Sequence, residues 1–265
     1  MIEADRLISA GTTLPEDVAE IKEMYKDVNY VKDRLIVSLI SAERNVNFLK
    51  DKPYRMLEDL AIFYKVLISK DANGTGTITV TNNHMEYWGL TEEQLYETAI
   101  KNSNVLEPPS IDRLTNVMAD LMRAQGMDED IIENQLKEDD IDMYVISNTT
   151  KANGASVIVY SDALQQVAEN LGSDLYILPS SIHEVLALPV GNKDVDSLEE
   201  MVRCVNQTEV SPTEVLSDNV YKYDAESRTL SLASAKAETV KETAVCEPSG
   251  YTGTVNEVAR PRHHR

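Results

Sequence analysis

The sequence predicts an α+β protein with mixed, largely antiparallel sheets that are built from hairpins and flanked by helices. The apolar runs at residues 35–40 and 60–68 are nearly continuous, which is typical of strands that are covered on both faces. Hairpin turns are interspersed with helix caps along the chain, whereas a doubly wound parallel sheet would alternate strand and helix throughout. Neither run approaches the roughly 20 apolar residues that a membrane-spanning helix requires.

The N-terminal half is expected to contain three helices and three strands. The helices are predicted at residues 13–28, 91–102 and 111–124, and the strands at 35–40, 60–68 and 77–81. Capping-box spacings begin the first two helices at Thr13 and Thr91. Two prolines end the second helix, and Ser110 is placed to cap the third. The Asn-Gly turn within residues 71–76 joins the second and third strands as a hairpin.

The C-terminal half is expected to continue in the same mixed pattern. Strands are predicted at residues 143–147, 155–160, 175–178, 184–188, 220–223 and 229–232, and helices at 161–171, 196–205 and from 211 onward. The dipeptide Asn153-Gly154 is a turn signal between the first two of these strands. Gly172 is expected to end the helix before it, because glycine readily adopts the left-handed conformation of a helix C-cap.

Composition divides the chain into four parts. We predict an N-terminal α+β part at 1–126, an acidic linker or helix at 127–142, and a C-terminal α+β part at 143–233. Beyond these, the apolar pattern fades, so residues 234–265 are expected to be disordered. The N-terminus carries acidic residues where a secretory signal would carry basic ones, and this predicts a cytoplasmic protein.

The charge restricts the partners of this protein. There are 45 acidic residues against 25 lysines and arginines, a formal net charge of −20. Direct nucleic-acid binding is disfavoured, because cationic groups supply the affinity for phosphate backbones. The sequence is instead consistent with a protein partner that has a basic surface, with solubility as the plainer explanation of the charge. The acidic binding candidates are Asp128, Glu129, Asp130, Asp139, Asp140 and Asp142. They lack the spacing of a calcium loop, so a solvated face is the alternative there.

The loop from Pro179 to Glu184 holds the candidate residues for an enzyme site. Ser181 and His183 lie two residues apart and resemble a nucleophile and a base. Catalytic triads, however, are assembled from distant elements, and the Gly-x-Ser-x-Gly turn is absent from this sequence. A serine-capped turn that leads into a strand is the alternative.

His84 and His183 are also candidates for a metal site, since two imidazoles and a carboxylate can hold a divalent ion. The hundred-odd residues between them carry no motif, and the sequence has neither His-Glu-x-x-His nor Cys-x-x-Cys. A capped turn anchored by Trp88 is the alternative for His84. We therefore predict neither a metal nor a cofactor.

Several segments together carry a family resemblance. They are residues 53–64, 86–89, 144–148, 153–155 and 171–185. Through them the chain resembles the uncharacterised bacterial domain-of-unknown-function family number 5688 over about residues 29–223. The resemblance implies a shared fold, but it supplies no activity and no catalytic residues. It also implies a setting among gut anaerobes and mobile elements, and members usually carry a further N-terminal region that we expect this chain to lack.

These observations favour an acidic protein-binding module over an enzyme. As a hypothesis, it is an inhibitor or accessory factor in conflicts between mobile elements and their hosts, and it engages a basic, nucleic-acid-binding protein. The alternative is an enzyme of unknown class with its site at Pro179 to Glu184.

Overall fold

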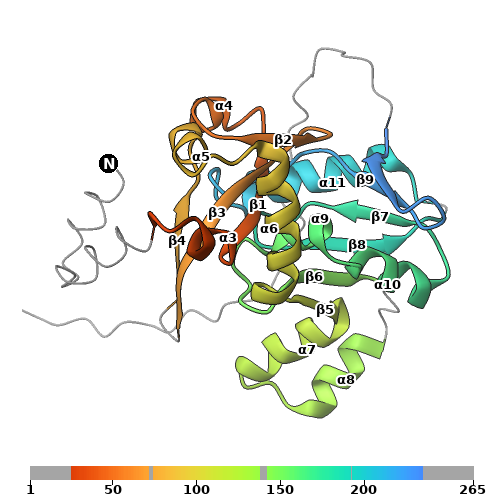
Figure 1. The fold of residues 1–265 in the computed structure, drawn as a ribbon. Coiled ribbons are helices and arrows are strands. Elements are labelled where there is room, and N and C mark those ends of the chain that lie inside the picture. Colours follow the sequence, from red (N-terminus) through yellow and green to blue (C-terminus); the bar gives the residue numbers. More distant parts are fainter. Residues whose placement is uncertain (1–24, 72–73, 138–141, 192, 235–265) are drawn as a thin grey trace, which may run out of the picture. The chain divides into compact units, whose positions relative to one another are not determined.

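The computed structural model describes residues 25–71, 74–137, 142–191 and 193–234. Most of the helix expected at 13–28, the candidates Asp139 and Asp140, and the tail from 235 onward lie outside the described residues. Within the described part, the chain has an α+β fold with antiparallel sheets and flanking helices, as the sequence predicted (Figure 1).

The first sheet is built around one long strand. Its strands are β1 (Leu35–Ser41), β2 (Tyr54–Leu57), β3 (Leu60–Asp71) and β4 (Gly74–Thr79). Strand β1 pairs antiparallel with one edge of β3, whereas β2 and then β4 pair antiparallel along the other edge. Leu60, Ile62 and Tyr64 of β3 face the main core, while Ala61 and Phe63 pack on the opposite side of the sheet. Burial on both faces explains why this strand is a continuous apolar run.

The second sheet contains six strands from the rest of the chain. They are β5 (Pro109–Arg113), β6 (Tyr144–Asn148), β7 (Leu175–Leu178), β8 (Val185–Pro189), β9 (Tyr221–Asp224) and β10 (Thr229–Leu232). Their order is β10-β9-β7-β8-β6-β5, and every neighbouring pair is antiparallel. The hairpin of β9 and β10 agrees with the sequence prediction. Strands β5 and β6 pair across the boundaries that the sequence suggested at residues 126 and 143. The division of the chain at these residues stays a prediction.

Helices and short helical turns cover these sheets. They are α3 (Val28–Lys32), α4 (Val46–Leu49), α5 (Asn82–Trp88), α6 (Glu92–Leu106), α7 (Leu114–Ala124), α8 (Glu129–Lys137), η1 (Gly154–Ser156), α9 (Val157–Tyr160), α10 (Ala163–Leu171) and α11 (Val195–Thr208). The main core joins residues of both sheets to α6, α9 and α10. Leu198 and Val202 of α11 pack with Tyr176 and Leu188 in a separate core that includes alternate residues of β7 and β8. The second sheet therefore also carries apolar residues on both faces.

Three sequence predictions of secondary structure are wrong. Residues 154–160 form η1 and α9, not a strand, and a short apolar run cannot distinguish a buried helix from a strand by periodicity alone. Ser110 lies within β5 and donates to Asp112 at 2.8 Å, so the following helix begins only at Leu114. The segment after residue 211 forms a turn. The structure also contains β2 and α5, which the sequence did not indicate as strand and helix.

Candidate functional site

The loop from Pro179 to Glu184 is organised as a serine-capped turn. The Ser181 hydroxyl accepts a hydrogen bond from the main-chain N–H of His183 at 3.0 Å, and the Ser181 N–H donates to the Glu184 carbonyl at 3.2 Å. The hydroxyl is thus bonded to the main chain of His183 and makes no hydrogen bond to its ring. Hydrogen bonding between nucleophile and base, the first geometric requirement of a serine nucleophile, is missing here. An enzyme centred on this loop stays a prediction, and the observed hydrogen bonds are those of a turn.

The imidazole of His183 has two neighbours from distant parts of the chain. Its Nδ1 accepts from the main-chain N–H of Asn153 at 3.2 Å, and its Nε2 lies 3.5 Å from a carboxylate oxygen of Glu214. In the neutral ring, the proton therefore sits on Nε2 and faces Glu214. Both side chains are more than a third exposed, and an ion pair in such a setting contributes little to stability. Glu214, and not the neighbouring Glu184, is the acid beside this histidine.

His84 caps the start of α5. Its Nδ1 accepts from the main-chain N–H of Thr81 at 3.1 Å and lies 3.0 Å from the Tyr25 hydroxyl. The main-chain N–H of His84 donates a hydrogen bond to the Thr81 hydroxyl. This completes a capping box in which histidine holds the position usually taken by Glu or Gln. The ring stacks on Trp88 at 5.5 Å between centroids, and burial lowers the pKa of His84 below its ordinary value. These contacts give His84 a structural role.

The two histidines that could form a metal site make their hydrogen bonds in different parts of the fold. His84 lies in α5 and is bonded to its N-cap Thr81, whereas His183 is bonded to Asn153, just before η1. Among the described residues, no three His, Cys, Asp or Glu side chains form a group that could hold a metal ion. No described helix is both long and apolar enough to cross a membrane.

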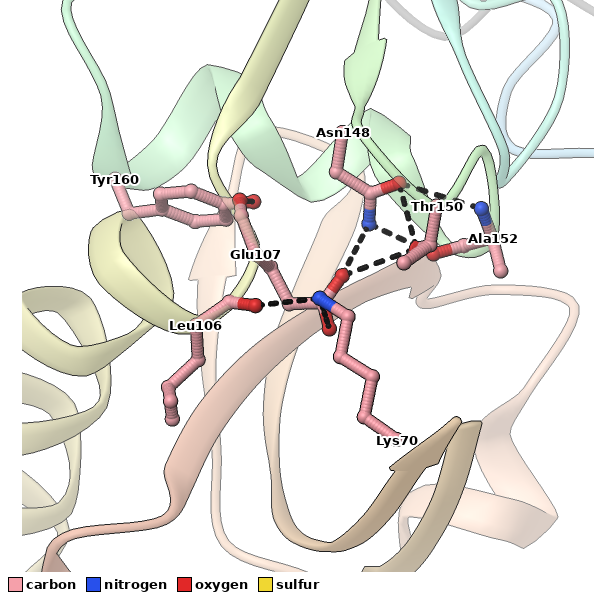
Figure 2. Close-up of polar contacts among 7 residues, drawn as sticks. All are labelled: Lys70, Leu106, Glu107, Asn148, Thr150, Ala152 and Tyr160. Atoms are coloured by element: carbon pink, nitrogen blue, oxygen red, sulfur yellow. Dashed lines mark hydrogen bonds and ion pairs between the residues drawn. The ribbon is translucent and has the colours of Figure 1, made fainter. Parts of the chain in front are cut away.

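A buried carboxylate that the sequence analysis missed organises the region between the sheets (Figure 2). Glu107 follows the last turn of α6 and is only 7% exposed. One carboxylate oxygen lies 3.1 Å from the Lys70 ammonium, and the other accepts from the Asn148 amide at 2.9 Å. The Thr150 hydroxyl lies 3.1 Å from the same second oxygen. The charge is thus paired and hydrogen-bonded, as a buried charge must be.

Asn148 orients this carboxylate from the end of β6. Its side-chain NH₂ donates both to Glu107 and to the Ala152 carbonyl, each at 2.9 Å. Its carbonyl oxygen accepts from the Ala152 N–H at 3.3 Å and lies 3.0 Å from the Thr150 hydroxyl. The Tyr160 hydroxyl donates to the Glu107 main-chain carbonyl at 2.6 Å. The cluster therefore ties β3, α6, β6 and α9 together.

A partly open pocket of about 110 Å³ adjoins this cluster. It is lined by Ile36, Val37, Ser38, Lys65, Thr75, Thr77, Glu107, Asn148, Thr150, Ala152, Asn153 and Ser156. Burial lowers the pKa of the Lys65 ammonium to about 8. Ser38 is 2% exposed, and its hydroxyl has no hydrogen-bond partner among the described residues. Lys65 and Ser38 each lie within a run of apolar residues. A polar side chain inside such a strand, which is buried on both faces, is the signal that could have indicated these two residues.

Three of the six acidic candidates lie on the helical hairpin of α7 and α8. Asp128, Glu129 and Asp130 are all exposed, and Glu129 pairs with Arg123 at 2.6 Å. Ile132 is buried and fixes α8, whereas Leu121 and Ile131 are 59% and 48% exposed. Asp142 is exposed just after the gap in the described chain. This hairpin therefore presents carboxylates and apolar side chains together.

Comparison with known proteins identifies the family but no function. No curated protein and no solved structure matches this chain. The match to a protein-family model covers residues 8–225, which is most of the chain. It begins nearer the N-terminus than the resemblance over about residues 29–223 that the sequence motifs indicated. The chain therefore belongs to the family of unknown function DUF5688.

Proposed function

We propose that this protein is a binding module that engages a partner protein with a basic surface through the hairpin of α7 and α8, here called the acidic hairpin (residues 114–137). Its support is the exposure of Leu121 and Ile131 beside carboxylates without ionic partners. Asp128 and Asp130 make no ion pair and accept no side-chain hydrogen bond within the described residues.

Charge and apolar surface play different parts in this proposal. The acidic hairpin has five acidic residues against one arginine and one lysine, and the chain as a whole has a net charge of −20. Such a surface accelerates encounter with a basic partner and repels acidic ones. The exposed isoleucine and leucine supply apolar area that is removed from water on binding, at about 25 cal/mol per Å². We further propose that the chain is an inhibitor or accessory factor of a nucleic-acid-binding protein. The nucleic acid and the acidic hairpin would then compete for the same cationic groups of that protein.

Site-specific crosslinking tests this proposal. A photo-crosslinking amino acid is placed at Ile131 in the full chain and, as a control, at Val105, which is 77% exposed on α6. We expect a protein with a basic surface to be captured from position 131 but not from position 105. That protein is then purified, and its affinity for the chain is measured at rising salt, because exposed ion pairs are screened above about 0.1 M.

A matched pair of variants separates local from overall charge. Asp128→Asn with Asp130→Asn removes two charges from the acidic hairpin, while Glu200→Gln with Glu209→Gln removes two exposed charges at α11. The first pair should weaken binding about tenfold or more at low salt, and the second should leave it within about twofold. An affinity that does not respond to salt, or that falls equally in both variants, would refute binding through this hairpin.

A further inference from the structure

Lys65 is a cation that makes no ion pair within the described part of the chain, although the Glu107 carboxylate lies near enough to favour its charged form. It lies in β3, opposite Ile36 of β1 on one side and Thr79 of β4 on the other. Its ammonium makes no hydrogen bond or ion pair with a described residue, and its nearest aromatic contact is the Phe63 ring at 5.2 Å. A partly buried charge normally has a partner, so an unpaired ammonium at the wall of a pocket favours the binding of a negative group there.

The nearby carboxylate does not fill this role. Glu107 is already bonded to Lys70, Asn148 and Thr150 (Figure 2). Lys65 and Glu107 line the pocket, and Lys70 pairs with Glu107 from outside the lining, so these three residues together carry a surplus of one positive charge. In a chain with 45 acidic residues, this local surplus is the reverse of the overall charge.

Hydroxyl groups complete the polar lining. Ser38 is nine-tenths buried, lines the pocket and has a hydroxyl without a partner. Thr75 and Thr77 of β4 also line it, and their hydroxyls make no hydrogen bond with the described residues. Buried polar groups are nearly always hydrogen-bonded in folded proteins, so the unpaired Ser38 hydroxyl is available to bond a ligand in this pocket.

We propose that this pocket binds the carboxylate group of a small organic acid, which pairs with Lys65 and accepts a hydrogen bond from Ser38. Ile36 and Ala152 supply apolar wall for a short aliphatic body. The volume of about 110 Å³ admits several water molecules, or an organic ion of only a few non-hydrogen atoms. A monoanion matches the surplus of one charge, whereas a phosphate dianion would bring a second charge close to Glu107.

The test uses the full chain and short-chain carboxylates as probes. Acetate, propionate and butyrate are titrated into lysine-labelled protein at constant ionic strength, and the ¹³Cε signal of Lys65 is followed by NMR. The Lys65 signal is assigned by its loss in Lys65→Met. We expect the amine to titrate near pH 8 in the free protein, and saturation with propionate to raise its pKa by at least one unit, since a nearby anion favours the charged form.

Variants separate this site from general anion binding. Lys65→Met should raise the Kd for propionate at least tenfold, while Lys101→Met, at an exposed lysine of α6, should not change it. Ser38→Ala should weaken binding several-fold without lowering the melting temperature, because the lost hydroxyl has no partner to leave unpaired. A purely structural Ser38 would change melting and not affinity.

The following outcomes would overturn the proposal: a Lys65 signal that no carboxylate moves, a Lys65→Met variant with unchanged Kd, or binding of inorganic phosphate in place of propionate. The inference is independent of the acidic hairpin. Asp128→Asn with Asp130→Asn should bind propionate as the wild type does, so either proposal can fail alone.

Discussion

Asn148→Asp is the most informative single substitution in the cluster around Glu107. It changes one NH₂ group to oxygen at a side chain that is 2% exposed. That NH₂ donates to a carboxylate oxygen of Glu107 and to the Ala152 carbonyl, each at 2.9 Å. Both hydrogen bonds would become contacts between two acceptors, and one of these contacts would join two carboxylates.

The expected loss of stability at pH 7 is about 4 kcal/mol or more. A hydrogen bond to a charged group contributes about 1.5–3 kcal/mol and one to a neutral carbonyl about 0.5–1.5 kcal/mol. Repulsion between the two carboxylates adds to these terms. For a domain of this size, 4 kcal/mol corresponds to a fall of roughly 8–16 °C in the melting temperature.

The pH dependence identifies the cause. Two carboxylates about 3 Å apart cannot both ionise, so the pKa of the pair is raised in the folded state above its unfolded value. The folded variant then binds more protons than the unfolded chain, and its stability is lost as the pH rises from about 4 through the raised folded pKa. Melting is followed by circular dichroism from pH 4 to 8 for Asn148→Asp and for the uncharged, similarly sized Asn148→Leu. A deficit of the same size in both variants at every pH would refute the role assigned to this amide.

Three further outcomes are expected. Gly154→Ala should cost about 1–3 kcal/mol in denaturant unfolding, because a methyl group there would lie 2.2 Å from the Ser147 hydroxyl oxygen, whereas Gly191→Ala, with open space around it, should be nearly neutral. In the wild type, the free energy of unfolding should fall as the pH drops below about 6.5, because burial lowers the pKa of His84 and the unfolded chain takes up the proton first. His84→Gln keeps a capping acceptor and should lessen this fall. An unchanged pH profile in this variant would contradict the burial argument. The free energy of unfolding should also rise between pH 8 and 10.5, because the buried ammonium of Lys65 loses its proton at a lower pH than it does in the unfolded chain. Lys65→Met should lessen this rise, as measured by urea titration at each pH.

Local signals predicted the elements whose burial follows from their own pattern. The runs that became β1 and β3 are apolar at nearly every position because both faces of the sheet are covered. Gly172 ends α10 with φ +62°, as the C-cap signal indicated. Thr91 begins α6 with a complete capping box. In each case, the residues that determine the element lie within a few positions of one another.

The prediction failed where distant residues determine the conformation. The segment from Ala155 to Tyr160 is apolar and partly β-branched, and by itself it resembles a strand. In the fold, Gly154 lies against Asn148 and the His183 carbonyl so closely that no side chain fits, and the next residues continue as α9. The close approach involves a residue about thirty positions away, and no local pattern encodes it.

The sequence by itself determined the charge of the surface, the fold class and the family, because composition, periodicity and family motifs are properties of the chain before it folds. It also placed exposed carboxylates on a helical segment. Only the tertiary structure decided that Ser181 would cap a turn and that Lys65, Glu107 and Asn148 would lie around one pocket. About forty residues of sequence separate each of these three residues from the next. The pairing of the strands and the packing of α6 against β1 bring them together. Side chains that form a site from separate elements have no characteristic spacing in the sequence. Their proximity can therefore be recognised only in the folded structure.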